Sequence, residues 1–291
     1  MKLISPKLKS TQHADDSREW TPGSFDNFLI ELDHIIDSCE GQDRAPLFRG
    51  YTNYEWLVDS TIVRNSIQHL FKISDYHKLP PEIRSTVQFH RALTSIILLK
   101  FGTVCRLNKK LIDREKSEGI DPWFEIMKHL QQYPEEDHFI NGTFLLDWSI
   151  SKDIALYFAT YKGKGEHRII SPNDGAVWIY DSVSTGNALQ TKKVGEILSL
   201  MKSEEFFNAD KTFPLIFHLP KQTPQPRSIN QKPVYVAQMD FRYDVAEMWA
   251  GYERQNNKRV FIKLILSENL KPDVAKYLQS KNVSEDVVYP E

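Results

Sequence analysis

An arginine stands in the middle of an apolar stretch. Residues 47–51 read Leu-Phe-Arg-Gly-Tyr, a run typical of a short buried strand. A guanidinium group is always charged and is seldom fully buried without a partner. We therefore expect Arg49 either to be neutralised by a carboxylate elsewhere in the chain or to bind an anionic ligand.

A second stretch, residues 144–161, could provide either partner. It reads FLLDWSISKDIALYFATY, which predicts a buried strand, a polar turn and a helix capped by Ser149 or Ser151. The first N–H groups of such a helix can bind an anion. Arg49 and this turn could hold a pyrophosphate between them, or Asp147 could form a core ion pair with Arg49.

The remaining pattern predicts an α+β protein. Apolar spacing indicates a helix over 27–39 and a long helix from Pro81, whereas 47–51 and 56–63 are expected to pair as strands through the turn between them. Further strands are expected within 175–181, 212–219, 233–241 and 259–266. We predict a mobile arm over 1–22 and one domain over 23–291. In this domain a helical N-terminal half, with a helical insertion at about 66–141, packs on a mixed or antiparallel sheet.

Composition excludes several functional classes. Lys+Arg 37 against Asp+Glu 39 gives a net charge of −2, so no global charge points to nucleic acid or an anionic membrane. Cys39 and Cys105 lie in no metal-binding pattern, and no metal site is expected. The N-terminus has no signal-peptide core and no apolar run could span a bilayer. We expect a cytoplasmic protein.

Three blocks of the chain resemble the FRG-domain family. The tripeptide Phe48-Arg49-Gly50 is the motif that gives the family its name, and residues 145–149 followed by 155–159 are similar to its LDWT-then-ALYFA block. Residues 227–235, with Arg227, Ile229 and Gln231, are similar to its late element, although Pro233 stands where glycine is usual. The resemblance spans roughly residues 45–291.

A weaker resemblance points to arginine-type ADP-ribosyltransferases. Phe48-Arg49-Gly50 is similar to their aromatic-Arg-Gly strand, and Ser149-Ile150-Ser151 to their Ser-Thr-Ser strand end. The resemblance implies an ADP-ribosyltransferase-like fold that binds NAD as a substrate. The residues implied in NAD binding are Arg49, Gly50, Ser149 and Ser151, with Tyr51, Trp148 or Tyr157 as an aromatic wall.

The third element of that family, a late Glu-x-Glu, is where the chain departs from the pattern. Gln231 and Pro233 fall where the two glutamates are expected. A neutral amide stabilises a developing cation less well than a carboxylate does. The resemblance therefore implies a catalytic set of Arg49, Asp147 and Gln231, with Glu247 or Glu253 as alternative carboxylates.

Three functional hypotheses follow. The first is an NAD-dependent ADP-ribosyltransferase that modifies RNA, DNA or protein, in the setting of a bacterial toxin or phage-defence effector with an antitoxin partner. The second is a non-catalytic module that binds NAD, ADP-ribose or nucleic acid. The third is a structural Arg49–Asp147 pair in a protein-binding domain. The first two predict a pocket that contains Arg49, Ser149 and Gln231, whereas the third predicts a sealed ion pair.

Overall fold

A computed structural model describes residues 19–39, 46–64, 142–183, 230–238 and 244–290, together with short pieces at 95, 127, 190–191, 196 and 215–218. The first 18 residues, the helix expected from Pro81 and the insertion at 66–141 lie outside this description, apart from isolated positions. The described part contains helices and a mixed sheet, which confirms the α+β class.

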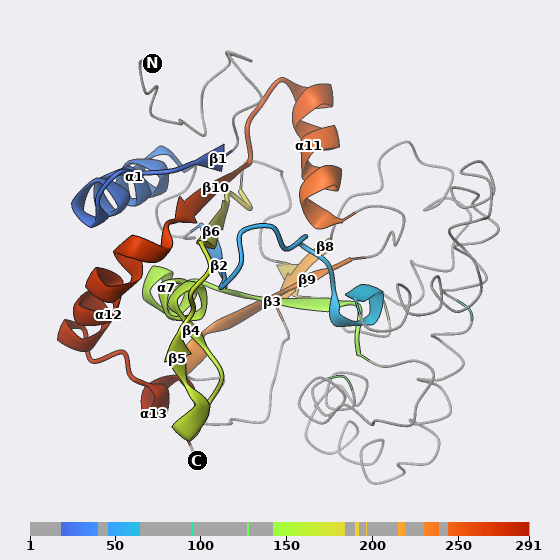
Figure 1. Ribbon diagram of the computed structural model, residues 1–291. Helices are drawn as coiled ribbons and strands as arrows, with labels where there is room; N and C mark the ends of the chain where they lie inside the picture. Colours follow the sequence, from blue (N-terminus) through green and yellow to red (C-terminus); the bar gives the residue numbers. More distant parts are fainter. Residues whose placement is uncertain are drawn as a thin grey trace, which may run out of the picture.

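Among the described residues, eight strands form one central sheet (Figure 1). Its order is β1-β10-β6-β2-β3-β9-β8-β7, and all neighbours are antiparallel except the outer pairs β1–β10 and β7–β8. The bounds are β1 (Glu19–Trp20), β2 (Leu47–Tyr51), β3 (Leu145–Ser149), β6 (Gly175–Tyr180), β7 (Gln190–Thr191), β8 (Leu215–His218), β9 (Pro233–Ala237) and β10 (Phe261–Leu266). Strands were predicted at each of the sites of β2, β3, β6, β8, β9 and β10.

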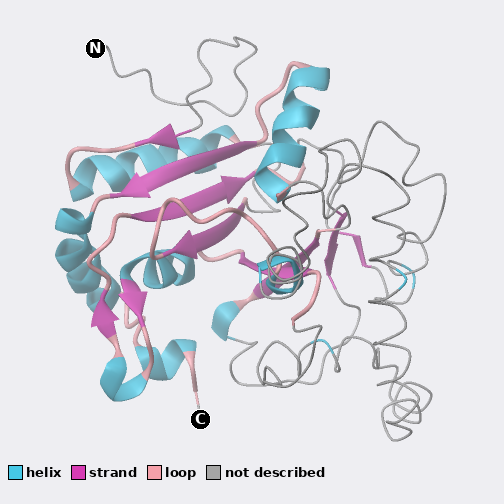
Figure 2. Cartoon of the chain, turned by 45° about the vertical axis from the view of Figure 1, so that its right-hand side comes forward, coloured by secondary structure: helices cyan, strands magenta, loops and turns pink. Residues whose placement is uncertain are grey.

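Helices cover both faces of this sheet (Figures 1 and 2). On one face, a shared apolar core joins the sheet to α1 (Phe25–Ser38), α7 (Lys152–Thr160), α12 (Lys271–Ser280) and α13 (Glu285–Val288). On the other face, α11 (Val245–Asn256) packs on a second core, in which Trp148, Tyr180 and Trp249 are in ring contact. A small hairpin of β4 (Tyr161–Lys162) and β5 (Ile169–Ile170) follows α7.

The helix predicted over 27–39 is confirmed as α1. Ser24 caps it by accepting a hydrogen bond from the Asn27 N–H at 3.2 Å, which satisfies one of the unpaired donors of the first turn. Phe28, Leu32 and Ile35 recur at helical spacing and are fully buried. Burial of this stripe against the sheet stabilises the helix.

Helix α7 lies unusually close to β2. A Cβ atom on Gly50 would stand 1.8 Å from the carbonyl oxygen of Ala155, so only glycine permits this approach. Ala155 and Ala159 present small side chains on the helix and are both buried. The small residues of both elements thus set the distance between helix and strand.

Two local predictions were wrong. Residues 56–60 form no strand, and β2 pairs with β6 and β3 instead of forming a hairpin with 56–63. Glu19 and Trp20 were assigned to a mobile arm, but they form β1 beside β10, where the Lys263 ammonium lies 2.5 Å from the Glu19 carboxylate.

Candidate functional site

The site lies where the central sheet is split. Strand β2 forms five residue pairs with β6, from Leu47↔Tyr180 to Tyr51↔Ala176, whereas it pairs with β3 only at Phe48↔Ser149. Beyond that pair the two strands separate. Strand β3 continues along β9 through five pairs, so the backbone groups of β2 and β3 that would have faced each other need other partners.

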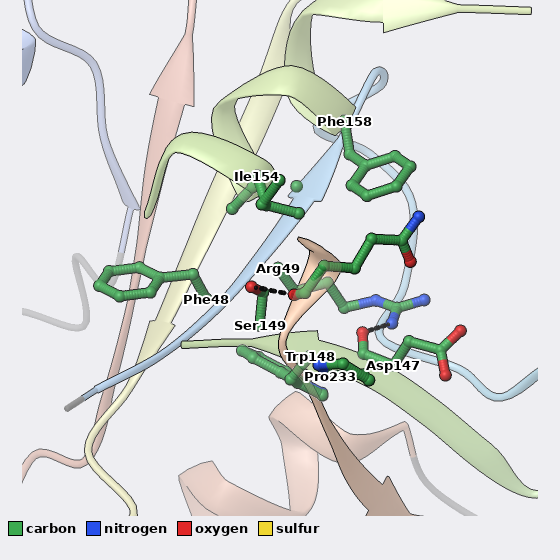
Figure 3. A pocket seen from close by; sticks show the side chains of 11 residues that line it. Phe48, Arg49, Asp147, Trp148, Ser149, Ile154, Phe158 and Pro233 are labelled. Carbon is green, nitrogen blue, oxygen red and sulfur yellow. Dashed lines mark hydrogen bonds between the residues drawn. The ribbon is translucent and has the colours of Figure 1, made fainter. Parts of the chain in front are cut away.

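A cavity of about 160 Å³ opens at this split. Its wall from β2 and β3 includes Arg49, Asp147 and Ser149, and Figure 3 shows Phe158 of α7 on the opposite side. The complete lining is Phe48, Arg49, Gly50, Asp147, Trp148, Ser149, Ile154, Ala155, Phe158, Gln231 and Pro233. The structure therefore brings together Arg49, Ser149 and Gln231, three residues that are far apart in the sequence.

Arg49 bridges the split. Its Nε donates a hydrogen bond to the Tyr51 hydroxyl at 2.8 Å. Its Nη1 donates to the backbone carbonyl of Asp147, as Figure 3 shows. The guanidinium carbon lies 5.0 Å from the centre of the Tyr51 ring. The side chain is thus held by neutral groups and keeps its positive charge beside the cavity.

The carboxylate of Asp147 is not buried against Arg49. The Asp147 residue is exposed at the mouth of the cavity, and its carbonyl is the group that accepts from Arg49. The prediction of a core ion pair between these side chains is therefore wrong. An exposed carboxylate beside a cavity is accessible to a ligand.

Ser149 and Gln231 join β3 to the chain before β9. The Ser149 hydroxyl donates to the Gln231 carbonyl at 2.7 Å and accepts from the Ser151 N–H at 3.0 Å. The Gln231 side-chain amide donates to the Val288 carbonyl at 2.7 Å. Both residues line the cavity, but these hydrogen bonds fix them to the protein.

Of the three aromatic residues implied as a wall, only Trp148 is among the lining residues. Tyr51 and Tyr157 do not line the cavity and are at most 4% exposed, and the Trp148 ring packs in the α11 core at 2% exposure. Phe158 is only partly buried and lines the cavity. The sequence predicted that Phe158 lies on a helix, but only the three-dimensional structure shows that it lines the cavity.

Ser151 stands at the N-cap position of α7, as predicted, but its side chain makes no capping hydrogen bond and does not line the cavity. Gly50 lines the cavity, and its lack of a side chain is required by the packing of α7. Of these two predicted cofactor-binding residues, only Gly50 lines the cavity.

The two alternative carboxylates lie elsewhere. Glu253 is buried, and its carboxylate accepts hydrogen bonds from the Val260 and Phe261 N–H groups at 2.6 and 3.2 Å. Glu247 is exposed in the first turn of α11. Neither residue lines the cavity. Asp147 is thus the single carboxylate that lines it among the described residues.

A second arginine, which sequence reasoning missed, lies near Arg49. Burial lowers the pKa of Arg64, and the positive charge of nearby Arg49 lowers it further. Tyr51, Asp59 and Asp147 lie near enough to oppose this change. Its Nε is buried and has no hydrogen-bond partner within the part of the chain that the structure describes. Arg64 followed a segment predicted as a strand, so nothing in the sequence indicated that it would turn back towards Arg49.

Among the described residues, no three His, Cys, Asp or Glu side chains are grouped as metal ligands would be. None of the helices within the described ranges has the length and apolar character needed to cross a membrane.

Comparison with known proteins identifies one family. Residues 44–168 match the family model of the FRG domain, a region that contains Phe48-Arg49-Gly50, β3 and α7. Searches of curated proteins and of solved structures gave no match. The matched region supplies most of the cavity wall, while Gln231 and Pro233 come from outside it. The chain therefore carries an FRG domain over residues 44–168.

Proposed function

We propose that the cavity between β2 and β3 binds NAD and that the protein is an ADP-ribosyltransferase acting on a macromolecule, with an ADP-ribosyltransferase-like fold. The observation that carries this proposal is the meeting of Arg49, Asp147 and Ser149 with Phe158 around one cavity. These groups supply a cation for phosphate, a carboxylate for a developing positive charge and an aromatic face for a ring.

Each residue has a defined part in the proposed complex. Arg49 retains guanidinium donors beyond its bonds to Tyr51 and Asp147, and these bind the pyrophosphate. Phe158 stacks on the nicotinamide ring. Because the cavity is small, it encloses only the reacting end of the dinucleotide, and the rest of the molecule extends outside it.

The proposed reaction breaks the bond between C1 of the ribose and the nicotinamide nitrogen. The bonding electron pair leaves with nicotinamide, which becomes neutral, and the sugar develops positive charge. Asp147 stabilises that charge. A nucleophilic oxygen or nitrogen of the acceptor then forms a bond to C1 and loses its proton, so that ADP-ribose is transferred.

The acceptor is proposed to be RNA, DNA or protein. Two segments with several Lys and Arg residues, 106–116 and 220–233, could contact the phosphates of a nucleic acid. The first and most of the second lie outside the described residues. The setting of a cytoplasmic toxin or phage-defence effector, restrained by an antitoxin, remains part of the proposal and rests on the family resemblance.

A second candidate is a module that binds NAD or ADP-ribose without turnover. One observation favours it: Gln231, which stands where a catalytic glutamate is expected, already donates its amide to Val288. Only Asp147 could then assist the chemistry among the described lining residues.

Nicotinamide release from NAD distinguishes these candidates. The wild type should release nicotinamide, faster when cell lysate supplies an acceptor, and Asp147→Asn should reduce the rate at least tenfold while leaving NAD affinity little changed. The matched control is Asp273→Asn, which changes an exposed carboxylate on α12. Arg49-dependent binding without release would select the binding module.

A further inference from the structure

The C-terminal segment, residues 284–290, touches the residues that form one wall of the cavity. Helix α13 is four residues long, and only Val288 of this helix is buried in the core. Figures 1 and 2 both show this segment beside the β4–β5 hairpin. A helix this short contributes little stability by itself, so its contacts decide its role.

The first contact is made by two side-chain amides. Asn230 Nδ2 donates to the Val287 carbonyl at 2.8 Å, and Gln231 Nε2 donates to the Val288 carbonyl at 2.7 Å. The last carbonyls of a helix have no partner within the helix. The amides satisfy these carbonyls, and in return the helix end fixes the Gln231 side chain.

The second contact holds the segment to the hairpin. The Gly165 N–H donates to the Glu285 carboxylate at 2.6 Å, and the Arg168 guanidinium lies 3.4 Å from the same group. These contacts place α13 independently of Gln231. The helix can therefore act as a fixed support.

The third contact reaches the aromatic wall. The Tyr289 ring lies 6.0 Å from the Phe158 ring at an interplanar angle of 86°, an edge-to-face arrangement. The Lys164 ammonium lies 4.3 Å from the centre of the Tyr289 ring, a cation–π contact that helps to hold this ring. Phe158 and Gln231, two lining residues from separate elements, are thus both in contact with the C-terminal segment.

We propose that the C-terminal segment is a positioning element of the binding site, which holds Gln231 and Phe158 in place for the ligand. Through the Gln231 carbonyl, its influence extends to Ser149 and to the turn that opens α7. Gln231 is then required as an amide donor, which an ionised glutamate cannot replace. The ligand that this wall contacts is the one named by the proposed function.

Hydrogen exchange tests the proposal without any ligand. The probes are the Ile150 amide, which donates to the Lys232 carbonyl, and the Ser151 amide, which donates to Ser149. Gln231→Glu and deletion of residues 284–291 should each accelerate exchange at these amides about tenfold, since one hydrogen bond contributes about this factor. Amides in the β6–β10 ladder should change much less.

A control separates positioning from core packing. Val274→Ala removes buried apolar atoms of α12 from the same core, outside the C-terminal segment. It should lower the melting temperature without a selective increase at Ile150 and Ser151. If Gln231→Glu leaves both probe amides unchanged, or if it raises exchange equally throughout the sheet, the proposal is wrong.

Binding of ADP-ribose provides a second readout. Gln231→Glu and the deletion should weaken it about tenfold, and Val274→Ala should not. A wild type that binds no ADP-ribose would contradict the proposed function, while the exchange result would still decide whether the segment positions the wall.

Discussion

Strand β2 has two neighbours and forms very different contacts with them. Towards β6 it forms a continuous ladder of five pairs, and towards β3 it forms one pair and then separates. On the continuous side the backbone groups are satisfied by the ladder. On the split side Arg49, Ser149 and Gln231 satisfy or connect them, and a cavity remains. An antiparallel sheet thus acquires a cavity lined by charged and polar groups where one of its strand pairs stops short.

The first test concerns the packing of α7 on β2. Gly50→Ala should destabilise the fold by more than about 3 kcal/mol, because the added Cβ would collide with the Ala155 carbonyl. Chemical denaturation measures the change in the free energy of unfolding. The matched control, Gly23→Ala, adds a Cβ with nothing within 4 Å and should be nearly neutral. Equal effects of the two variants would contradict the assigned packing.

The second test concerns the end of the continuous side. Lys271 is fully buried, and its ammonium donates to the Thr52 carbonyl just after β2 at 3.3 Å. Burial lowers its pKa from 10.5 to about 8, although Asp174 and Glu268 oppose this change. The unfolded chain therefore binds more protons than the folded protein between about pH 8 and 10.5.

Stability should accordingly rise with pH across that window, relative to Lys271→Met, which cannot titrate. The expected relative gain is about 3 kcal/mol at most. Urea denaturation of both proteins from pH 7 to 10.5 measures it. Parallel curves would show that the buried amine keeps an ordinary pKa.

The third test concerns the split side. Ser149→Ala removes the hydroxyl that connects the Gln231 carbonyl to the Ser151 N–H and should cost about 1–2 kcal/mol of stability. Ser280→Ala removes an exposed hydroxyl bonded to the Tyr277 carbonyl and should cost less than about 0.5 kcal/mol. Thermal unfolding compares them, and equal losses would remove Ser149 from its connecting role.

Much of the sheet could be predicted because its strands carry clear local signals. The apolar runs of β2, β3, β6 and β10 are bounded by polar or turn residues. The segment 56–63 carries the same signal, but the strand predicted there does not form. Its backbone groups are satisfied from outside: the Val58 carbonyl accepts from the Val245 N–H, and the Ser60 N–H donates to the Gln238 side chain. Such distant partners leave no local pattern.

The sequence predicted which residues line the cavity better than it predicted their hydrogen-bond partners. The motifs brought attention to Arg49, Ser149 and Gln231, which do line one cavity. The partner of Arg49 was expected to be a carboxylate and is instead a backbone carbonyl, which every residue possesses and no sequence pattern marks. Similarly, the contact between Gln231 and Val288 joins residues 57 positions apart.

The most direct test of the account is NAD binding by the wild type and by Arg49→Met, measured by calorimetry. We expect Arg49→Met to remain folded, with an unchanged circular dichroism spectrum, but to bind NAD at least tenfold more weakly, because the phosphate loses its cation. Arg254→Met, which removes an arginine from α11 away from the cavity, should bind as the wild type does. Equal NAD affinity in wild type and Arg49→Met would contradict the claim that the split beside β2 is a site for this anion.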